Sequence, residues 1–143
     1  MAIDKKFINQ FLGVTSKAAL ASSYLVGKKD KIAADGAAVD SMRKELNKIN
    51  IQGQIVIGEG ELDEAPMLYI GEKVGNESGP KFDIAVDPLE GTNFAANNLP
   101  GALSVIAIAE KNSLFHAPET YMEKISTRVN EKNVIDLDYT VKK

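Results

Sequence analysis

The stretch Phe82-Asp83-Ile84-Ala85-Val86-Asp87-Pro88-Leu89-Glu90-Gly91-Thr92 decides how this chain of 143 residues is interpreted. Its first five residues form a mostly apolar run, which predicts a buried β-strand over 82–86. Pro88 fixes its own backbone φ and biases Asp87 toward an extended conformation, whereas Gly91 lets the backbone approach a ligand closely. Two carboxylates, a glycine and a hydroxyl are thereby expected together at the end of one strand: Asp87, Glu90, Gly91 and Thr92.

A second acidic group follows another short apolar run. Residues 54–57 predict a buried strand, and Glu59 and Glu61 come after it, with a glycine on each side of Glu59. Residues two apart in an extended chain point the same way, so both carboxylates would face one side. Each acidic group alone is also compatible with a solvated turn. Two strands that both end in carboxylates can instead share divalent cations, which prefer oxygen ligands.

Two further acids have an ordinary explanation as helix caps. Asp35 is expected as the N-cap of a helix over about 36–49, and Asp63 as the cap of a third helix. The apolar face of that third helix would be Met67, Ile70 and Val74. The alternative is that Asp35 joins the metal site and that Asp63 activates a water. His116, the single histidine of the sequence, is assigned no role.

The order of the predicted elements indicates an α+β fold. Apolar stripes over 4–26 and about 36–49 predict two helices, which we expect to pack as an antiparallel pair. Alternation of apolar and polar residues over 135–141 predicts a half-exposed final strand. Further strands are predicted at 54–57, 82–86, 102–109 and, after a hairpin turn, 114–116. Helices first and strands later favour a mixed, mostly antiparallel sheet with the helix pair packed on it.

Composition excludes several classes of function. The chain is 44% hydrophobic and 26% charged, and its net charge of −3 gives no sign of nucleic-acid binding. The sequence has no cysteine, which removes thiolate metal sites and cysteine nucleophiles. It also has neither a run of about 20 apolar residues nor a signal-peptide core, so we expect a cytoplasmic protein without a membrane segment. A bound metal would supply the positive charge that attracts a phosphate ester.

These motifs resemble the class II fructose-1,6-bisphosphatases, which belong to the lithium-sensitive, metal-dependent sugar phosphatase superfamily. The resemblance extends over nearly the whole chain and is carried by residues 34–38, 55–61, 63–72, 83–92 and 117–124. It implies gluconeogenic hydrolysis of the 1-phosphate of fructose 1,6-bisphosphate, with Mn²⁺ or Mg²⁺ as cofactor. It also implies an αβαβα sandwich fold.

Site residues follow from the resemblance at the matching positions. The metal ligands would be Asp35, Glu59, Asp87 and Glu90; the water-activating residues would be Thr92 and Asp63; and the substrate contacts would be Glu90, Gly91, Thr92 and Tyr121. A small-molecule sugar bisphosphate is the expected partner, with no nucleic acid and no membrane.

Members of that family are more than twice as long as this chain. Their C-terminal half supplies a Lys-Pro-Arg segment, an Asp-Gly-Asp segment and a further glutamate ligand, none of which occurs here. We therefore expect residues 1–143 to be the N-terminal metal-binding domain, without the C-terminal domain, and to hydrolyse fructose 1,6-bisphosphate poorly alone. The alternatives are a related inositol or sedoheptulose phosphatase and a non-catalytic metal- or phosphate-binding domain. Uncovered apolar surface would recruit a second copy, so we expect a homo-oligomer.

Overall fold

The computed structural model describes residues 3–59, 67–116, 123–129, 135–136 and 138–139. Within these ranges the helices are α1 (Lys6–Ser23), α2 (Lys31–Leu46) and α3 (Thr92–Ala96). The strands are β1 (Gln52–Ile57), β2 (Lys73–Val74), β3 (Lys81–Glu90) and β4 (Leu103–Glu110). No helix in the described part of the chain has the length and apolar character that crossing a membrane requires.

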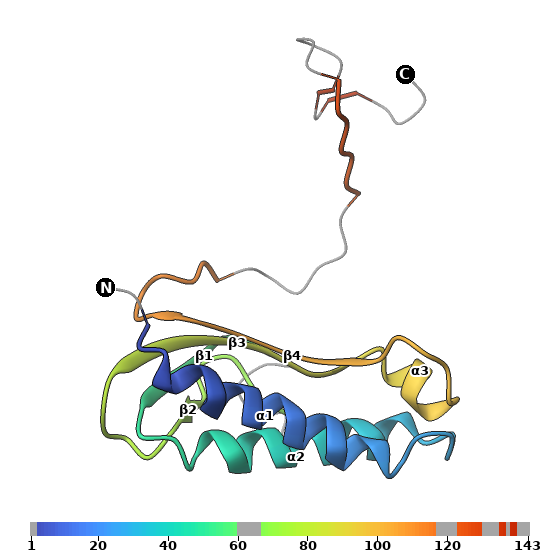
Figure 1. Cartoon of the computed structure of the whole chain (residues 1–143). Coiled ribbons are helices and arrows are strands. Elements are labelled where there is room, and N and C mark those ends of the chain that lie inside the picture. Colours follow the sequence, from blue (N-terminus) through green and yellow to red (C-terminus); the bar gives the residue numbers. More distant parts are fainter. Residues whose placement is uncertain (1–2, 60–66, 117–122, 130–134, 137, 140–143) are drawn as a thin grey trace.

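The four strands form one mixed sheet in the order β2-β1-β3-β4. β1 and β3 run parallel, whereas β2 pairs with β1 and β4 pairs with β3 in the antiparallel sense. Figure 1 shows α1 and α2 side by side and running in opposite directions along one face of this sheet. The predicted α+β fold, with an antiparallel helix pair on a mixed, mostly antiparallel sheet, is confirmed. Of the implied αβαβα sandwich, the described residues form one helix layer and one sheet layer.

The core lies between the helix pair and the sheet. The predicted apolar stripe of α1 is confirmed, since Phe7, Phe11 and Val14 are all buried. The ring of Phe7 meets that of Phe82 on β3 edge to face, with the ring centres 5.3 Å apart. α2 turns five apolar residues to the same core: Ala34, Ala38, Val39, Met42 and Leu46. Burying each large apolar side chain contributes about 1.5–3 kcal/mol, so this interface fixes how α2 lies against β3.

α2 begins one turn earlier than predicted. Its N-cap is Asp30, whose Oδ1 accepts a hydrogen bond from the N–H of Ala33 at 2.9 Å. The prediction that Asp35 is the N-cap is therefore wrong, because Asp35 lies inside the helix. Starting the helix at Lys31 places Ala34 in the core, where its side chain is completely buried. The carboxylate of Asp35 has no capping role and needs another explanation.

The predicted third helix is wrong over the part of its range that is described. Residues 67–72 form turns, and Val74 lies in β2, where it pairs with Gly53. Gly71 and Gly75 have φ values of 93° and 97°, a left-handed conformation that interrupts a right-handed helix. Residues 60–66, which include Asp63 and its predicted cap, lie outside the described residues.

β3 continues to Glu90, beyond its predicted end at Val86. Pro88 has no N–H to donate, and the pairing of β3 with β4 changes register between Asp87 and Glu90, which accommodates it. α3 follows directly after Gly91. Asp87 and Glu90 are thus held within the last part of a strand and do not follow it.

Two predicted strands near the C-terminus are not strands in the described residues. The turn at 111–112 is present, but residues 114–116 form no ladder because the N–H of Leu114 donates to the Asp83 carboxylate. In the range 135–141, the described residues form a turn in which the N–H of Tyr139 donates to the carbonyl of Asp136. Alternating polarity predicts a half-exposed strand, but it does not supply the neighbouring strand that such a strand must pair with.

Candidate active site at the strand ends

The parallel pairing of β1 with β3 brings the two acidic groups to one edge of the sheet. Ile57, the last residue of β1, pairs with Ala85 of β3, so Glu59 and Asp87 each follow this last pair by two residues at the same edge of the sheet. The N–H of Glu59 donates to the carbonyl of Leu68 at 3.0 Å, and the side chain of Glu59 is half-buried. A fully solvated turn, the ordinary explanation for Glu59, does not fit this placement.

Gly58 has a steric reason to be glycine. A Cβ at this position would lie 2.2 Å from the carbonyl oxygen of Leu68 and 2.7 Å from the side chain of Ile55. Any other residue would therefore push the two backbone segments apart and break the hydrogen bond that fixes Glu59. One of the two glycines that flank Glu59 is explained by this close approach, and the other, Gly60, lies outside the described residues.

Asp87 is half-buried, and no cationic side chain is among the groups that shift its pKa. Its Oδ1 is buried without a hydrogen-bond partner in the described part of the chain. The pKa of Asp87 is raised to about 6: burial is the largest cause, the hydrogen bond and charge of Glu90 and the charge of Asp35 act in the same direction, and the Leu89 backbone N–H opposes them. This environment disfavours the ionised carboxylate, and a nearby cation would favour it.

Asp35 approaches this group from the second turn of α2. Burial raises its pKa as well, and its Oδ1 is also buried without a hydrogen-bond partner among the residues described. Because buried polar atoms in folded proteins almost always have partners, two such oxygens at one place require an explanation. A divalent cation would satisfy the oxygens of Asp35 and Asp87 and remove their mutual repulsion.

Gly91 and Thr92 complete the segment that the sequence singled out. Gly91 has a φ of 80°, which turns the chain from β3 into α3, and its carbonyl accepts the N–H of Phe94 at 2.8 Å. Thr92 is the first residue of α3 and is half-buried, whereas Glu90 is exposed. Thr92 thus lies two residues after Glu90 in the sequence, and the side chain of Glu90 forms a hydrogen bond with that of Asp87.

The described residues do not by themselves make a complete metal site. Within the described ranges, no three His, Asp or Glu side chains are arranged as ligands of one ion. Asp35 and Glu90 both raise the pKa of Asp87, Glu90 through a hydrogen bond and its charge and Asp35 through its charge. Asp63 and Tyr121 lie outside the described residues, and their roles stay predictions. Carboxylate oxygens as the sole donors suit Mg²⁺ or Mn²⁺ better than Zn²⁺.

Sequence reasoning missed the ion pair that fixes α2 beside this site. The Arg43 guanidinium donates to the Glu72 carboxylate through Nε at 2.7 Å and Nη2 at 3.1 Å, and also to the carbonyl of Met67. Glu72 is only 8% exposed. This clamp joins the helix that carries Asp35 to the segment whose Leu68 carbonyl holds Glu59. The partners are 29 residues apart, and no spacing in the sequence indicates them.

Comparison with known families decides the relationship. A family model described as bacterial fructose-1,6-bisphosphatase, glpX-encoded, matches residues 5–143. The chain belongs to this family. The resemblance to class II fructose-1,6-bisphosphatases is therefore confirmed.

Curated relatives of the family carry the name D-fructose 1,6-bisphosphatase class 2/sedoheptulose 1,7-bisphosphatase. The protein of Prochlorococcus marinus (strain MIT 9303) is 51% identical over 135 residues, which cover 94% of this chain and 40% of the relative. The protein of Synechococcus sp. (strain CC9902) is 50% identical with the same coverage. That of Prochlorococcus marinus (strain NATL1A) is 48% identical over 138 residues, 96% of this chain and 41% of the relative. The chain thus spans about two fifths of the length of these relatives.

Proposed function

We propose that this chain is the N-terminal, metal-binding part of a phosphatase that hydrolyses the 1-phosphate of fructose 1,6-bisphosphate. One observation carries the proposal: Asp35 and Asp87 converge from α2 and β3, each with a buried Oδ1 that no described residue satisfies. Structural carboxylates of a folded chain normally find donors. Two that do not, beside a third carboxylate in Glu90, form a place for a cation. The names of the relatives supply the substrate class.

The metal ligands of this proposal are Asp35, Glu59, Asp87 and Glu90, holding Mn²⁺ or Mg²⁺. A bound divalent cation lowers the pKa of a coordinated water and offsets the negative charge of a phosphate ester. The protein's own contribution is to hold the carboxylates at fixed positions. The parallel pairing of β1 with β3 brings the strand ends that precede Glu59 and carry Asp87 to one edge of the sheet, and the core packing of α2 holds the helix that carries Asp35.

Residues that follow the carboxylates would contact the substrate. In this proposal Glu90, Gly91 and Thr92 meet the sugar phosphate, because they form the turn at the exposed end of β3. The Thr92 hydroxyl would orient the attacking water by accepting or donating a hydrogen bond, with Asp63 as the group that takes its proton. Tyr121 would contact the sugar.

A second substrate, sedoheptulose 1,7-bisphosphate, is supported by the same relatives, whose names include it. Both compounds are ketose bisphosphates with a phosphate on C1, so one site could serve both. An inositol phosphate carries its phosphate on a ring carbon of a cyclohexane polyol and not on the primary C1 of a ketose, and it appears in none of the names quoted above. A role in gluconeogenesis, a cytoplasmic location and a homo-oligomeric state stay predictions.

The test is phosphate release from three substrates, with Mn²⁺ and with a chelator. The substrates are fructose 1,6-bisphosphate, sedoheptulose 1,7-bisphosphate and inositol 1-phosphate. We expect slow, Mn²⁺-dependent release from the two ketose bisphosphates and none from the inositol phosphate. Asp87→Asn should abolish it, while Asp40→Asn, at an exposed position of the same helix as Asp35, should not. Release that persists in Asp87→Asn or in chelator contradicts the proposal. Mn²⁺ binding without any release favours the non-catalytic alternative.

A further inference from the structure

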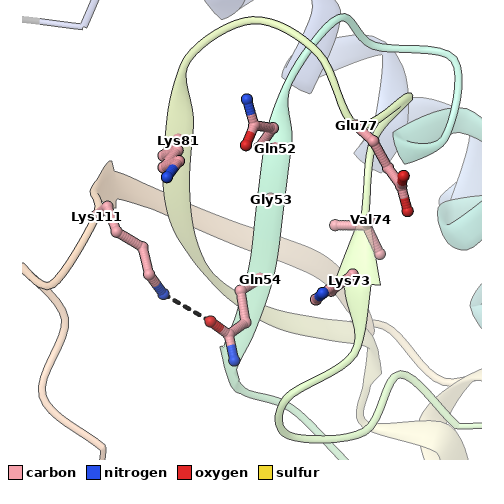
Figure 2. Close-up of a pocket in the computed structure, with 8 residues that line it drawn as sticks. All are labelled: Gln52, Gly53, Gln54, Lys73, Val74, Glu77, Lys81 and Lys111. Carbon is pink, nitrogen blue, oxygen red and sulfur yellow. Dashed lines mark hydrogen bonds between the residues drawn. The ribbon is translucent and has the colours of Figure 1, made fainter.

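A second charged site lies at the other end of the same strands (Figure 2). A cavity of about 360 Å³ opens over the starts of β1 and β3 and is lined by Gln52, Gln54, Lys73, Glu77, Lys81 and Lys111. Lys81 is the first residue of β3, and Asp87 follows six residues later. At the rise of an extended strand this separates Lys81 from Asp87 by about 20 Å. Gln54, which lines the nearer side of the cavity, pairs with Asp83, four residues or about 13 Å before Asp87.

The lysines of β2 and β3 flank β1 from its two sides. Lys73 pairs with Gln54, and Lys81 pairs with Gln52, so the four side chains are cross-strand neighbours. Figure 2 shows the two glutamines on β1 between the two lysines. The backbones of β2 and β3 are separated by two strand spacings, or about 10 Å. Lysine side chains are long and flexible, so two ammonium groups at this separation can meet one anion above β1.

Neither of these two lysines has its charge balanced. Within the described residues, Lys73 and Lys81 take part in no ion pair and no side-chain hydrogen bond. Glu77 also lines the cavity, but it forms no ion pair with either lysine in that part of the chain. Two positive charges on one face of a sheet repel each other, and an anion between them would convert that repulsion into attraction.

Lys111 gives the cavity a fixed wall. Its Nζ donates to the carboxylate of Asp83 at 3.0 Å and to Oε1 of Gln54 at 2.6 Å. Asp83 is only 2% exposed, so it anchors Lys111 from inside the sheet. Because Oε1 of Gln54 accepts from Lys111, only the amide NH₂ of Gln54 is left as a donor for a ligand. The site thus presents two unbalanced ammonium groups and an amide donor.

We propose that this cavity binds a small anion of the phosphate-monoester class. A dianion matches the two unbalanced charges of Lys73 and Lys81, and lysine is a common phosphate ligand that acts as a point charge. The volume lies at the lower end of the range for small-molecule sites, which fits a phosphate group or a monophosphorylated sugar. This site is separate from the carboxylates of β1 and β3, and its ligand is bound without hydrolysis.

The experiment is an NMR titration of the ¹⁵N-labelled 143-residue chain with inorganic phosphate and, separately, glucose 6-phosphate. A chelator prevents binding through a metal at the carboxylates, and sodium chloride keeps the ionic strength constant. We expect saturable shifts of the backbone amides of Gln52, Gln54, Lys73 and Lys81. Tighter binding of glucose 6-phosphate would identify a sugar phosphate as the ligand, and equal affinity the phosphate group alone. No saturable shift at these amides overturns the proposal.

Variants separate this site from a general effect of charge. The double variant Lys73→Gln and Lys81→Gln should weaken phosphate binding about tenfold, since each exposed ion pair contributes a modest factor. The matched control, Lys28→Gln and Lys44→Gln, removes the same charge from exposed positions elsewhere and should bind like the wild type. Equal weakening in both double variants contradicts the proposal. Matching unfolding temperatures would show that all variants are folded.

Discussion

Asp83 and Asp87 lie four residues apart on β3 and face the same side of the strand, yet their environments are opposite. Burial favours the neutral form of Asp83, but hydrogen bonds from Lys111, Leu114 and Ser113 outweigh it and lower the pKa of Asp83. Burial and, after it, the Glu90 and Asp35 carboxylates together raise the pKa of Asp87 to about 6. The described residues satisfy the first carboxylate and leave Oδ1 of the second without a hydrogen-bond partner. The comparison teaches that partners, and not burial, separate a structural acid from a candidate ligand.

The largest expected effect comes from removing the satisfied acid. Asp83→Ala leaves the Lys111 ammonium and the N–H groups of Ser113 and Leu114 without their acceptor. We expect a loss of about 2–4 kcal/mol in the free energy of unfolding, measured by urea denaturation. Asp40→Asn, which changes a carboxylate that is 75% exposed, should stay within about 0.5 kcal/mol of the wild type. Similar small losses in both variants would break the contrast between Asp83 and an ordinary surface acid.

Glu72 extends the comparison to a second satisfied carboxylate. Arg43→Met removes both donors of its bidentate ion pair and leaves a nearly buried carboxylate behind. We expect a loss of about 2–3 kcal/mol in the free energy of unfolding, somewhat less than for Asp83 because Arg43 is partly exposed. The measurement is the same urea denaturation. An unchanged stability would mean that Glu72 is hydrated and that the clamp does not fix α2.

The contribution of Asp87 to the free energy of unfolding should fall as pH rises, whereas an acid with a lowered pKa, such as Asp83, contributes more as pH rises. Its pKa is about 6 in the folded chain and 3.8 ordinarily, so the folded state holds the proton more tightly. The resulting stabilisation is complete below pH 3.8 and is lost as pH rises through 6. Between these values and in chelator, the wild type should lose about 1–2 kcal/mol relative to Asp87→Asn, after allowance for solvent screening. A flat difference between the two proteins, or one that grows with pH, would contradict the assigned environment.

The smallest expected effect is the difference between the contributions of Glu90 and Asp35 to the pKa of Asp87. Glu90 raises the pKa of Asp87 through both a hydrogen bond and its charge, whereas Asp35 acts through charge alone. Glu90→Gln should therefore lower the pKa of Asp87 by more than Asp35→Asn does. A carboxyl ¹³C NMR titration of the metal-free variants measures both values. The reverse order would mean that Asp35 lies closer to Asp87 than the structure places it.

The elements that leave a regular spacing of apolar residues in the sequence could be predicted from it. The stripe of Phe7, Phe11 and Val14 indicated α1, and the continuous apolar run over 102–109 indicated β4. The first and last residues of helices were harder to predict, because they depend on how the helix packs against the rest of the chain. Asp30 and Asp35 are both acceptable N-caps, and the burial of Ala34 decides between them.

The candidate site was predictable as a set of residues but not as an arrangement. Acidic residues after two apolar runs indicated Glu59 and Asp87, and the parallel register of β1 and β3 then brought these strand ends together. No local pattern indicates that the charge of Asp35 on α2 acts on Asp87, because the position of α2 depends on how it packs on the sheet. Asp83 shows the same limit, since its partner Lys111 lies 28 residues away. Whether a buried acid has hydrogen-bond and ion-pair partners depends on residues far away in the sequence, and short sequence patterns do not indicate them.

The most direct test of the central claim is calorimetric titration of Mn²⁺ into the 143-residue chain at pH 7.5. The account predicts that the wild type binds Mn²⁺, that Asp87→Asn removes binding, and that Asp40→Asn retains it. Binding should also raise the free energy of unfolding with the logarithm of the ratio of free metal to its dissociation constant. A wild-type chain that binds no Mn²⁺, or an Asp87→Asn variant that binds it with wild-type affinity, would contradict the claim that these strand ends form a cation site.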